Sequence, residues 1–399
     1  MSNALQFVQK KFQEYYIKNK VILPPRFIQR EYGFMFFEKE GMVRHLKFSS
    51  ENEIMEFIRK NVPAHSYYSS AYYKNPEAQK MDEKAWMGAD LIFDLDADHM
   101  VSGNVSYEEM LNIVKREAKK LIYEFLLNDF GFENRDINLV FSGGRGYHIH
   151  IRNNKVLNLG SDERREIVSY ITASNMNFET FINDQLLKQR TFLENEGGWY
   201  GKFAREIRHV SMLLRELYDS NNISELENIL KEAGIRNRKK LLNILFGTKK
   251  IFRENNYVVE KRIIDILSDF DDPKRINYLG DEENIQLFFQ IVKHFISIDL
   301  VGETDEPVTT DIHRLIRLPG SLHGKTGLKV TPVPLENFDL FDPLNDAVVK
   351  EFFQKDIKVI IKKDFSIKIL DQKFTYKQGE DIMPEGLALF GILRGFVDL

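Results

Sequence analysis

Hydrophobic positions along the chain predict helices near both ends and short strands between them. Residues 107–129 repeat apolar side chains every three to four positions, which is the spacing of an amphipathic helix. Two further helices are predicted at residues 4–19 and 384–395. Short apolar runs bounded by glycine or charged turns predict strands within residues 30–37, 43–48, 90–96, 137–151, 357–361, 365–369 and 373–376.

The middle of the chain has a different pattern from its two ends. Residues 163–300 are mainly helical, whereas strands and helices mix on either side. We therefore predict an α/β (α+β) fold, in which a core of mixed β-sheets flanked by helices is interrupted by a mainly helical insertion. The predicted parts are a first piece of the core at 1–205, the insertion at 206–280, and a second piece of the core at 281–399.

Composition excludes several classes of protein. The 399 residues contain no run of 18 apolar positions and begin without a signal pattern, so we expect a cytoplasmic protein with no membrane contact. Cysteine is absent, which excludes a disulfide framework and a Cys-ligated zinc site. The net charge is −4, so a nucleic-acid enzyme of this composition is expected to bind DNA weakly alone or to take affinity from a partner.

An acidic motif lies on the predicted strand at 90–96. Because side chains alternate along a strand, Asp94, Asp96 and Asp98 share one face, with neighbouring Cα atoms about 7 Å apart. Carboxylates this close repel each other unless a cation lies between them, and Mg²⁺ prefers oxygen ligands of this kind. The alternative is a strand that simply runs into an Asp-rich turn, which is the favoured interpretation for Asp98.

A glycine-rich turn follows in Ser142-Gly-Gly-Arg145-Gly-Tyr-His148-Ile-His150. Glycines allow the backbone to wrap closely around a phosphate, and Arg145 and Ser142 offer donors to its oxygens. His148 and His150 share a face of the following strand. The alternatives are a plain glycine hairpin and a core histidine.

A third, basic motif gathers Arg314, Arg317, His323 and Lys325 around Pro and Gly, which suits a polyphosphate. Its Gly-Lys-Thr is not a P-loop, because only three residues separate it from Gly320 and no long helix follows. The acids upstream of this motif, taken singly, are solvated loop residues.

In their order and spacing these motifs resemble the archaeo-eukaryotic DNA primase small (catalytic) subunit, archaeal type. The matching residues are Asp94-Leu-Asp96, the turn from Ser142 to His148, and Asp305 followed by Ser321 to Gly327. REYGF near the N-terminus, PAHSYYSSAYY and the closing MPEGLALFGILRG are also similar.

The resemblance implies a DNA-dependent nucleotidyltransferase that synthesises short primers on single-stranded DNA from nucleoside triphosphates for DNA replication. Asp94, Asp96 and Asp305 are expected to be catalytic and to hold two Mg²⁺ or Mn²⁺ ions. Arg30 is expected to approach the nucleotide. The expected nucleotide-binding residues are Ser142, Arg145, His148, Arg317, His323 and Lys325. A heterodimer with the primase large subunit is the expected assembly.

The chain departs from the family in one respect. The stretch after Asp98 lacks the cysteines of the family's zinc knuckle, so no structural zinc is expected. Two alternatives to a primase remain: a repair or gap-filling polymerase of the same superfamily, which extends but does not initiate, and a catalytically silent scaffold subunit.

Overall fold

The computed structural model describes residues 2–97, 105–174, 180, 193–253, 257–269, 272–296 and 306–399. The chain forms two compact units. One, the sheet unit, contains residues 1–127, 132–168 and 302–399, and the other, the helical unit, contains residues 128–131 and 169–301. The sheet unit is therefore built from both ends of the chain.

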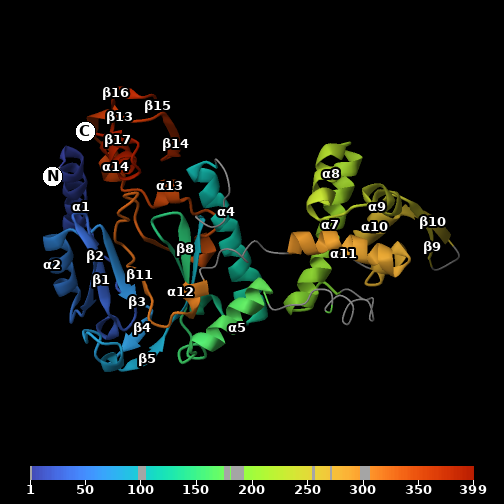
Figure 1. The fold of residues 1–399 in the computed structure, drawn as a ribbon, viewed down its shortest axis with the longest axis horizontal. Coiled ribbons are helices and arrows are strands. Elements are labelled where there is room, and N and C mark those ends of the chain that lie inside the picture. Colours follow the sequence, from blue (N-terminus) through green and yellow to red (C-terminus); the bar gives the residue numbers. More distant parts are fainter. Residues whose placement is uncertain are drawn as a thin grey trace. The chain divides into compact units, whose positions relative to one another are not determined.

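Two four-stranded sheets form the centre of the sheet unit (Figure 1). The first has the order β11-β3-β1-β2, with β1 Tyr32–Phe36, β2 Lys39–Leu46, β3 His65–Ser69 and β11 Leu315–Arg317. The second has the order β12-β7-β8-β6, with β6 Leu91–Asp96, β7 Ile137–Phe141, β8 Gly146–Ile151 and β12 Thr331–Val333. Each sheet thus takes its edge strand β11 or β12 from the C-terminal part of the chain.

Smaller sheets and helices surround these two. The remaining strands are β4 Ala71–Tyr73 paired with β5 Trp86–Ala89, β13 Asp356–Ile361 between β16 Gly379–Pro384 and β17 Val397–Asp398, and the hairpin of β14 Phe365–Ile369 and β15 Gln372–Tyr376. The helices are α1 Asn3–Lys18, α2 Glu51–Asn61, α4 Tyr107–Lys120, which continues as a π-helix to Asp129, α5 Ser161–Thr172, α12 Glu306–Thr310, α13 Pro343–Asp346 and α14 Glu385–Leu393. The predicted α+β class is confirmed, but every strand pair among the described residues is antiparallel, whereas we predicted mixed sheets.

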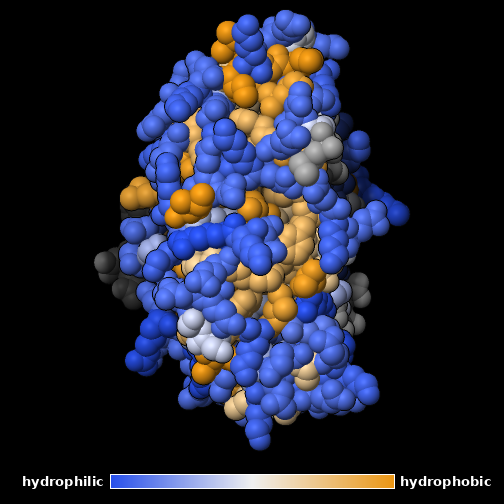
Figure 2. Space-filling model, turned by 90° about the vertical axis from the view of Figure 1, so that its left-hand side faces the viewer, coloured by the Kyte–Doolittle hydropathy of each residue, from blue (hydrophilic) through white to orange (hydrophobic). Residues whose placement is uncertain are grey.

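Serine side chains begin the main helices of the sheet unit. Ser2, Ser50 and Ser106 precede α1, α2 and α4, and each hydroxyl accepts a hydrogen bond from a backbone N–H in the first turn. Such caps satisfy N–H groups that have no partner within the helix. On the face that carries α1 and α2, hydrophilic residues predominate and hydrophobic residues gather near the middle and the top (Figure 2). No described helix is long and apolar enough to cross a membrane.

The described residues of the helical unit form mainly α-helices and one hairpin. These are α7 Gly198–Asp219, α8 Ile223–Glu232, α9 Arg238–Leu245, α10 Ile263–Leu267, α11 Glu282–Ile296, and the hairpin of β9 Thr248–Arg253 and β10 Tyr257–Arg262. The predicted insertion, 206–280, lies inside this unit, which begins earlier and ends later. The reason is that α7 packs on α11, where the rings of Phe203 and Phe289 lie 4.9 Å apart, centroid to centroid.

Candidate active site

Two carboxylates of β6 face groups from the neighbouring strand β8. In the register of the two strands, Asp94 lies opposite His148 and Asp96 lies opposite Gly146. The Nε2 atom of His148 lies 3.5 Å from Asp94 Oδ1, and the Nε atom of Arg145 lies 3.7 Å from Asp96 Oδ1. Phe93 and Leu95, which alternate with the two acids along the strand, are fully buried. The alternation of β6 therefore fixes both carboxylates beside the glycine turn.

The turn between β7 and β8 keeps its shape through glycines. Gly143 has a φ of +76°, and a Cβ on Gly146 would lie 1.9 Å from a carbonyl oxygen of β6. Inside the turn, Ser142 Oγ accepts a hydrogen bond of 3.2 Å from the Gly144 N–H. The hydroxyl of Tyr107, the first residue of α4, donates to the Gly144 carbonyl. The turn is therefore anchored from a second element.

The segment Ser321–Gly327 packs directly on this glycine turn. A Cβ on Gly143 would lie 2.8 Å from His323 Cβ, so the side chain of His323 fills the space that glycine leaves. Thr326 Oγ1 donates a hydrogen bond of 2.5 Å to the Gly143 carbonyl. His323 Nδ1 accepts from the Lys325 N–H at 3.3 Å. Two motifs that are far apart in the sequence thus form one surface.

Arg317 joins the same site from β11, through His65 of β3. Arg317 Nη1 lies 2.6 Å from His65 Nδ1, and its guanidinium lies over the ring of Tyr67 at 5.2 Å. The same Nδ1 atom accepts from the Gly324 N–H at 3.2 Å. Because Nδ1 accepts both bonds, the ring proton of His65 is on Nε2. The ring also lies 4.9 Å from that of His323.

The histidines of the site are neutral at physiological pH. Burial, followed by the nearby charge of Arg317, lowers the pKa of His65 and that of His148 to about 3. The same two causes lower the pKa of His323 well below its ordinary value. A neutral imidazole both donates and accepts a hydrogen bond. Positive charge at the site therefore comes from its arginine and lysine side chains.

The carboxylate pair suits a hard divalent cation. The Asp94 and Asp96 side chains are 24% and 41% exposed, so both oxygen pairs are open to solvent. Oxygen donors of this kind are the preferred ligands of Mg²⁺. Asp98 and Asp305 lie outside the described residues, and within the described part no group of three potential ligands is found.

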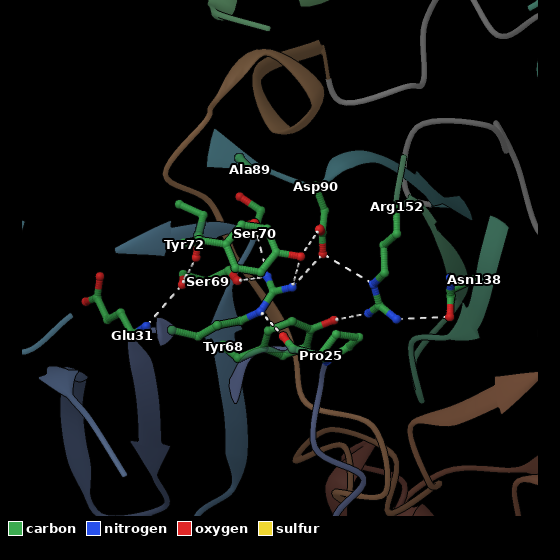
Figure 3. A network of polar contacts seen from close by, with 12 residues as sticks. Pro25, Glu31, Tyr68, Ser69, Ser70, Tyr72, Ala89, Asp90, Asn138 and Arg152 are labelled. Carbon is green, nitrogen blue, oxygen red and sulfur yellow. Dashed lines mark hydrogen bonds and ion pairs between the residues drawn. The ribbon is translucent and has the colours of Figure 1, made fainter. Parts of the chain in front are cut away.

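The expected approach of Arg30 to the nucleotide is wrong, because this side chain is fully buried. Its partners Pro25, Ser69, Ser70, Tyr72 and Asp90 are labelled in Figure 3. All of its N–H groups are used, on Pro25 O, Ser69 O, Ser70 O, Tyr72 OH and Asp90 Oδ2. Asp90 also lies 3.4 Å from Arg152. This cluster ties β3 to Asp90, the residue that precedes β6, and β6 carries Asp94 and Asp96.

His150 is a core residue, which is one of the alternatives that the sequence left open for this motif. It is fully buried, its ring stacks on that of Tyr68 at 6.2 Å, and neither ring nitrogen has a hydrogen-bond partner in the described structure. Two residues of the site were missed in the sequence. His65 lies in the PAHSYYSSAYY stretch that resembles the family, but the sequence assigned it no role, and Tyr107 is in an ordinary position for the first residue of a helix.

Comparisons with known proteins agree with the geometry. The family model described as DNA primase small subunit matches residues 93–335, a range that includes every predicted site residue from Asp94 to Lys325. A protein named DNA primase small subunit PriS from Methanothrix thermoacetophila is 40% identical to this chain, covering 100% of it and 99% of the relative. Proteins of the same name from Picrophilus torridus and Methanocella arvoryzae are 40% and 36% identical over 95% and 98% of this chain.

The match with the relative from Methanothrix thermoacetophila extends over nearly the full length of both proteins. The range of the family model includes the two acids, the glycine turn and the basic segment that the fold brings together. The chain belongs to the DNA primase small subunit family, whose members are nucleotidyltransferase enzymes.

Proposed function

We propose that this chain is the catalytic subunit of a DNA primase, which synthesises short primers on single-stranded DNA from nucleoside triphosphates. The observation that carries the proposal is the packing of the Ser321–Gly327 segment on the glycine turn beside Asp94 and Asp96. A nucleotidyl transfer needs carboxylates next to donors for a triphosphate, and this packing supplies both in one place.

Asp94 and Asp96, with Asp305 as the third ligand, would hold two Mg²⁺ or Mn²⁺ ions. Bound there, such ions stabilise charge on the attacking and leaving oxygens of an in-line displacement. Because the chain has no cysteine, we also expect it to hold no structural zinc. The pairing of Arg145 with Asp96 at 3.7 Å supports a role for that arginine next to the reacting phosphate.

The triphosphate would lie between the two turns. Arg145, Arg317 and Lys325 supply positive charge, and Ser142 supplies a hydroxyl. The neutral rings of His148 and His323 add hydrogen-bonding groups without adding charge. Arg317 is held by His65 and Tyr67 before any ligand binds, which lowers the entropy lost on binding.

The proposed partners are single-stranded DNA template, nucleoside triphosphates and a primase large subunit. The names of the relatives call them small subunits, which supports a larger partner for this chain. With a net charge of −4, the isolated chain has no global attraction to DNA, so we expect the partner to add template affinity.

The test supplies unprimed single-stranded template, nucleoside triphosphates and Mg²⁺ or Mn²⁺, and looks for short oligomers. We expect wild-type chain to form them and an Asp94→Asn variant with an unchanged melting temperature to form none. Extension of supplied primers without initiation would identify a gap-filling polymerase. No product with either metal, with and without the large subunit, would identify a silent scaffold.

A further inference from the structure

The helical unit contains a strongly basic segment that includes none of the residues of the candidate active site. Residues 236–250 contain six basic residues and no acidic one, in a chain whose net charge is −4. These six are Arg236, Arg238, Lys239, Lys240, Lys249 and Lys250. They belong to the start of α9 and the start of β9, and we call them the α9–β9 basic surface (Figure 1).

The fold brings both ends of this segment to the start of α11. Lys240 Nζ lies 2.8 Å from Glu283 Oε1, in the first turn of α11. Lys249 Nζ lies 3.9 Å from the position of a Cβ on Gly280, just before that helix. The fully buried Leu241 and Leu245 anchor α9 beneath them. Lys240 and Lys249, from the two ends of the segment, therefore both lie at the start of α11.

Most of these cations have no acidic partner. Arg236, Lys239, Lys249 and Lys250 are exposed, and none of them forms an ion pair with any carboxylate of the described residues. Among the acids near these cations, Glu283 pairs with Lys240, Asp281 accepts from the Asn284 N–H, and Glu260 lies opposite Lys250 in the hairpin. With Glu282 of α11 these acids number four, against six cations in the segment.

The arrangement is unfavourable for the protein alone. The first turn of α9 carries three cations and no acid, although the N-terminus of a helix disfavours positive charge. In the hairpin, Lys249 lies directly opposite Lys261, and like charges at such positions repel. A bound polyanion would relieve both kinds of repulsion.

An exposed aromatic ring lies at the other end of α9. Tyr218 of α7 is 41% exposed and stacks on Phe246, which ends α9, with 3.6 Å between centroids and 13° between planes. Cations at the start of α9 and an exposed ring at its end suit a single strand, whose phosphates and bases are both accessible. Double-stranded nucleic acid would leave such a ring unused.

We propose that the α9–β9 basic surface binds single-stranded nucleic acid, with phosphates on its lysines and arginines and a base on Tyr218. The proposal depends on the proposed function only for the origin of the strand, which is template or nascent primer. The surface belongs to the helical unit and shares no residue with the candidate active site, and we expect its loss to leave the nucleotide KM unchanged.

The experiment measures binding of labelled oligo(dT) and oligo(U) to the full chain over a range of salt concentrations, without nucleotides. The test variant is Lys239→Gln/Lys249→Gln/Lys250→Gln. The matched control, Lys355→Gln/Lys358→Gln/Lys373→Gln, removes the same charge from exposed lysines of the sheet unit. Each phosphate contact on a single strand contributes about 0.7 to the slope of log K against log salt, so three contribute about 2.

We expect the test variant to weaken binding about tenfold near 0.1 M salt and to lower the slope by about 2, while the control follows wild type. Tyr218→Leu is expected to weaken binding without changing the slope, by about fivefold or more. Tighter binding of oligo(dT) would identify the strand as DNA template, and tighter binding of oligo(U) would identify it as a nascent RNA primer. Equal losses in test and control variants, or no loss in either, would overturn the proposal.

Melting temperature and primer synthesis are measured beside oligomer binding. If melting shows that the triple variant is partly unfolded, Arg236→Gln/Lys239→Gln replaces it, with an expected decrease in slope of about 1.4. If the wild-type chain makes no primers, but the lysine variant still binds the oligomers more weakly than wild type, only the proposed function is refuted. Normal primer synthesis with unchanged oligomer binding in every variant would refute only this inference.

Discussion

At the scale of single residues, the site separates charge from hydrogen bonding. Buried histidines beside Arg317 do not take up a second proton, so His65 stays neutral and its Nδ1 accepts hydrogen bonds. The charge that remains belongs to flexible or forked cations at the surface of the two turns. This division makes the effect of removing one cation different from that of removing one histidine.

Lys325→Ala is expected to raise the KM for nucleotide and to leave the melting temperature unchanged. Lys325 is exposed, and its backbone N–H, not its side chain, supports His323. The loss of one charge-assisted contact costs about 1.5–3 kcal/mol, which corresponds to a KM increase of roughly tenfold to a hundredfold. Steady-state kinetics measure it, with Lys373→Ala as an exposed control. An unaltered KM would remove Lys325 from the nucleotide site.

His323→Ala is a less clean probe of the nucleotide site. The ring is only 7% exposed and packs against Gly143 and His65, so its removal leaves a cavity as well as a missing ligand. A lower melting temperature is expected to accompany any rise in KM.

Asp305→Asn is expected to abolish nucleotide incorporation, whereas Asp311→Asn keeps most of it. Asp311 Oδ1 accepts the His313 N–H at 2.8 Å, so this carboxylate stabilises a turn just before β11. Its loss costs about 1 kcal/mol of stability at most. Primer synthesis and thermal melts of both variants are the measurements. An active Asp305→Asn beside an inactive but folded Asp311→Asn would show that the third ligand is Asp311.

At the scale of elements, the glycine turn is held in place by the Ser321–Gly327 segment that packs on it. Glycine at 143 adopts a φ of +76°, and a side chain there would meet His323. Gly41, with a φ of +81°, has nothing within 4 Å of an added Cβ. The two glycines share a left-handed φ and differ in packing, so alanine variants at the two positions form a matched pair.

Gly143→Ala is therefore expected to raise the nucleotide KM and to lower the melting temperature by more than Gly41→Ala does. The left-handed backbone costs each variant roughly 1–2 kcal/mol. Only Gly143→Ala must also move His323, at a further cost of about 1–3 kcal/mol for an overpacked contact. Kinetics and melts of the two variants test this. Equal KM values for wild type and both variants would mean that the two turns do not act together.

The sequence predicted the elements better than their assembly. The positions of β6, β7, β8 and the strands from β13 to β15 follow from alternation and turn residues, which are local properties. Pairing depends on contacts between distant segments, so periodicity could not show that β11 joins β3 or that all pairs are antiparallel. Nor could it show that Arg30 is buried, since its partners lie 5 to 60 positions away.

At the scale of the whole molecule, neutral buried histidines tie stability to pH. For His65, the folded pKa is about 3 and the ordinary value is 6.5. Between these two values the unfolded chain binds a proton that the folded chain does not. The free energy of unfolding therefore rises with pH through this window. The contribution of His65 to it is lost progressively as pH falls below about 6.5. His150 and His323, whose pKa values burial also lowers, act in the same direction.

We expect the free energy of unfolding to fall steeply between pH 6 and 5, with each such histidine contributing about 1.4 kcal/mol per pH unit. His65→Asn removes one titrating group while its amide oxygen can still accept the hydrogen bond from Arg317. The variant is expected to be less stable than wild type at pH 8 and to have a shallower slope, by about 1.4 kcal/mol per pH unit, between pH 6 and 5. Urea unfolding at a series of pH values gives both slopes. Parallel curves for wild type and His65→Asn would mean that His65 takes up its proton in the folded protein, and that Arg317 is not held by a neutral ring.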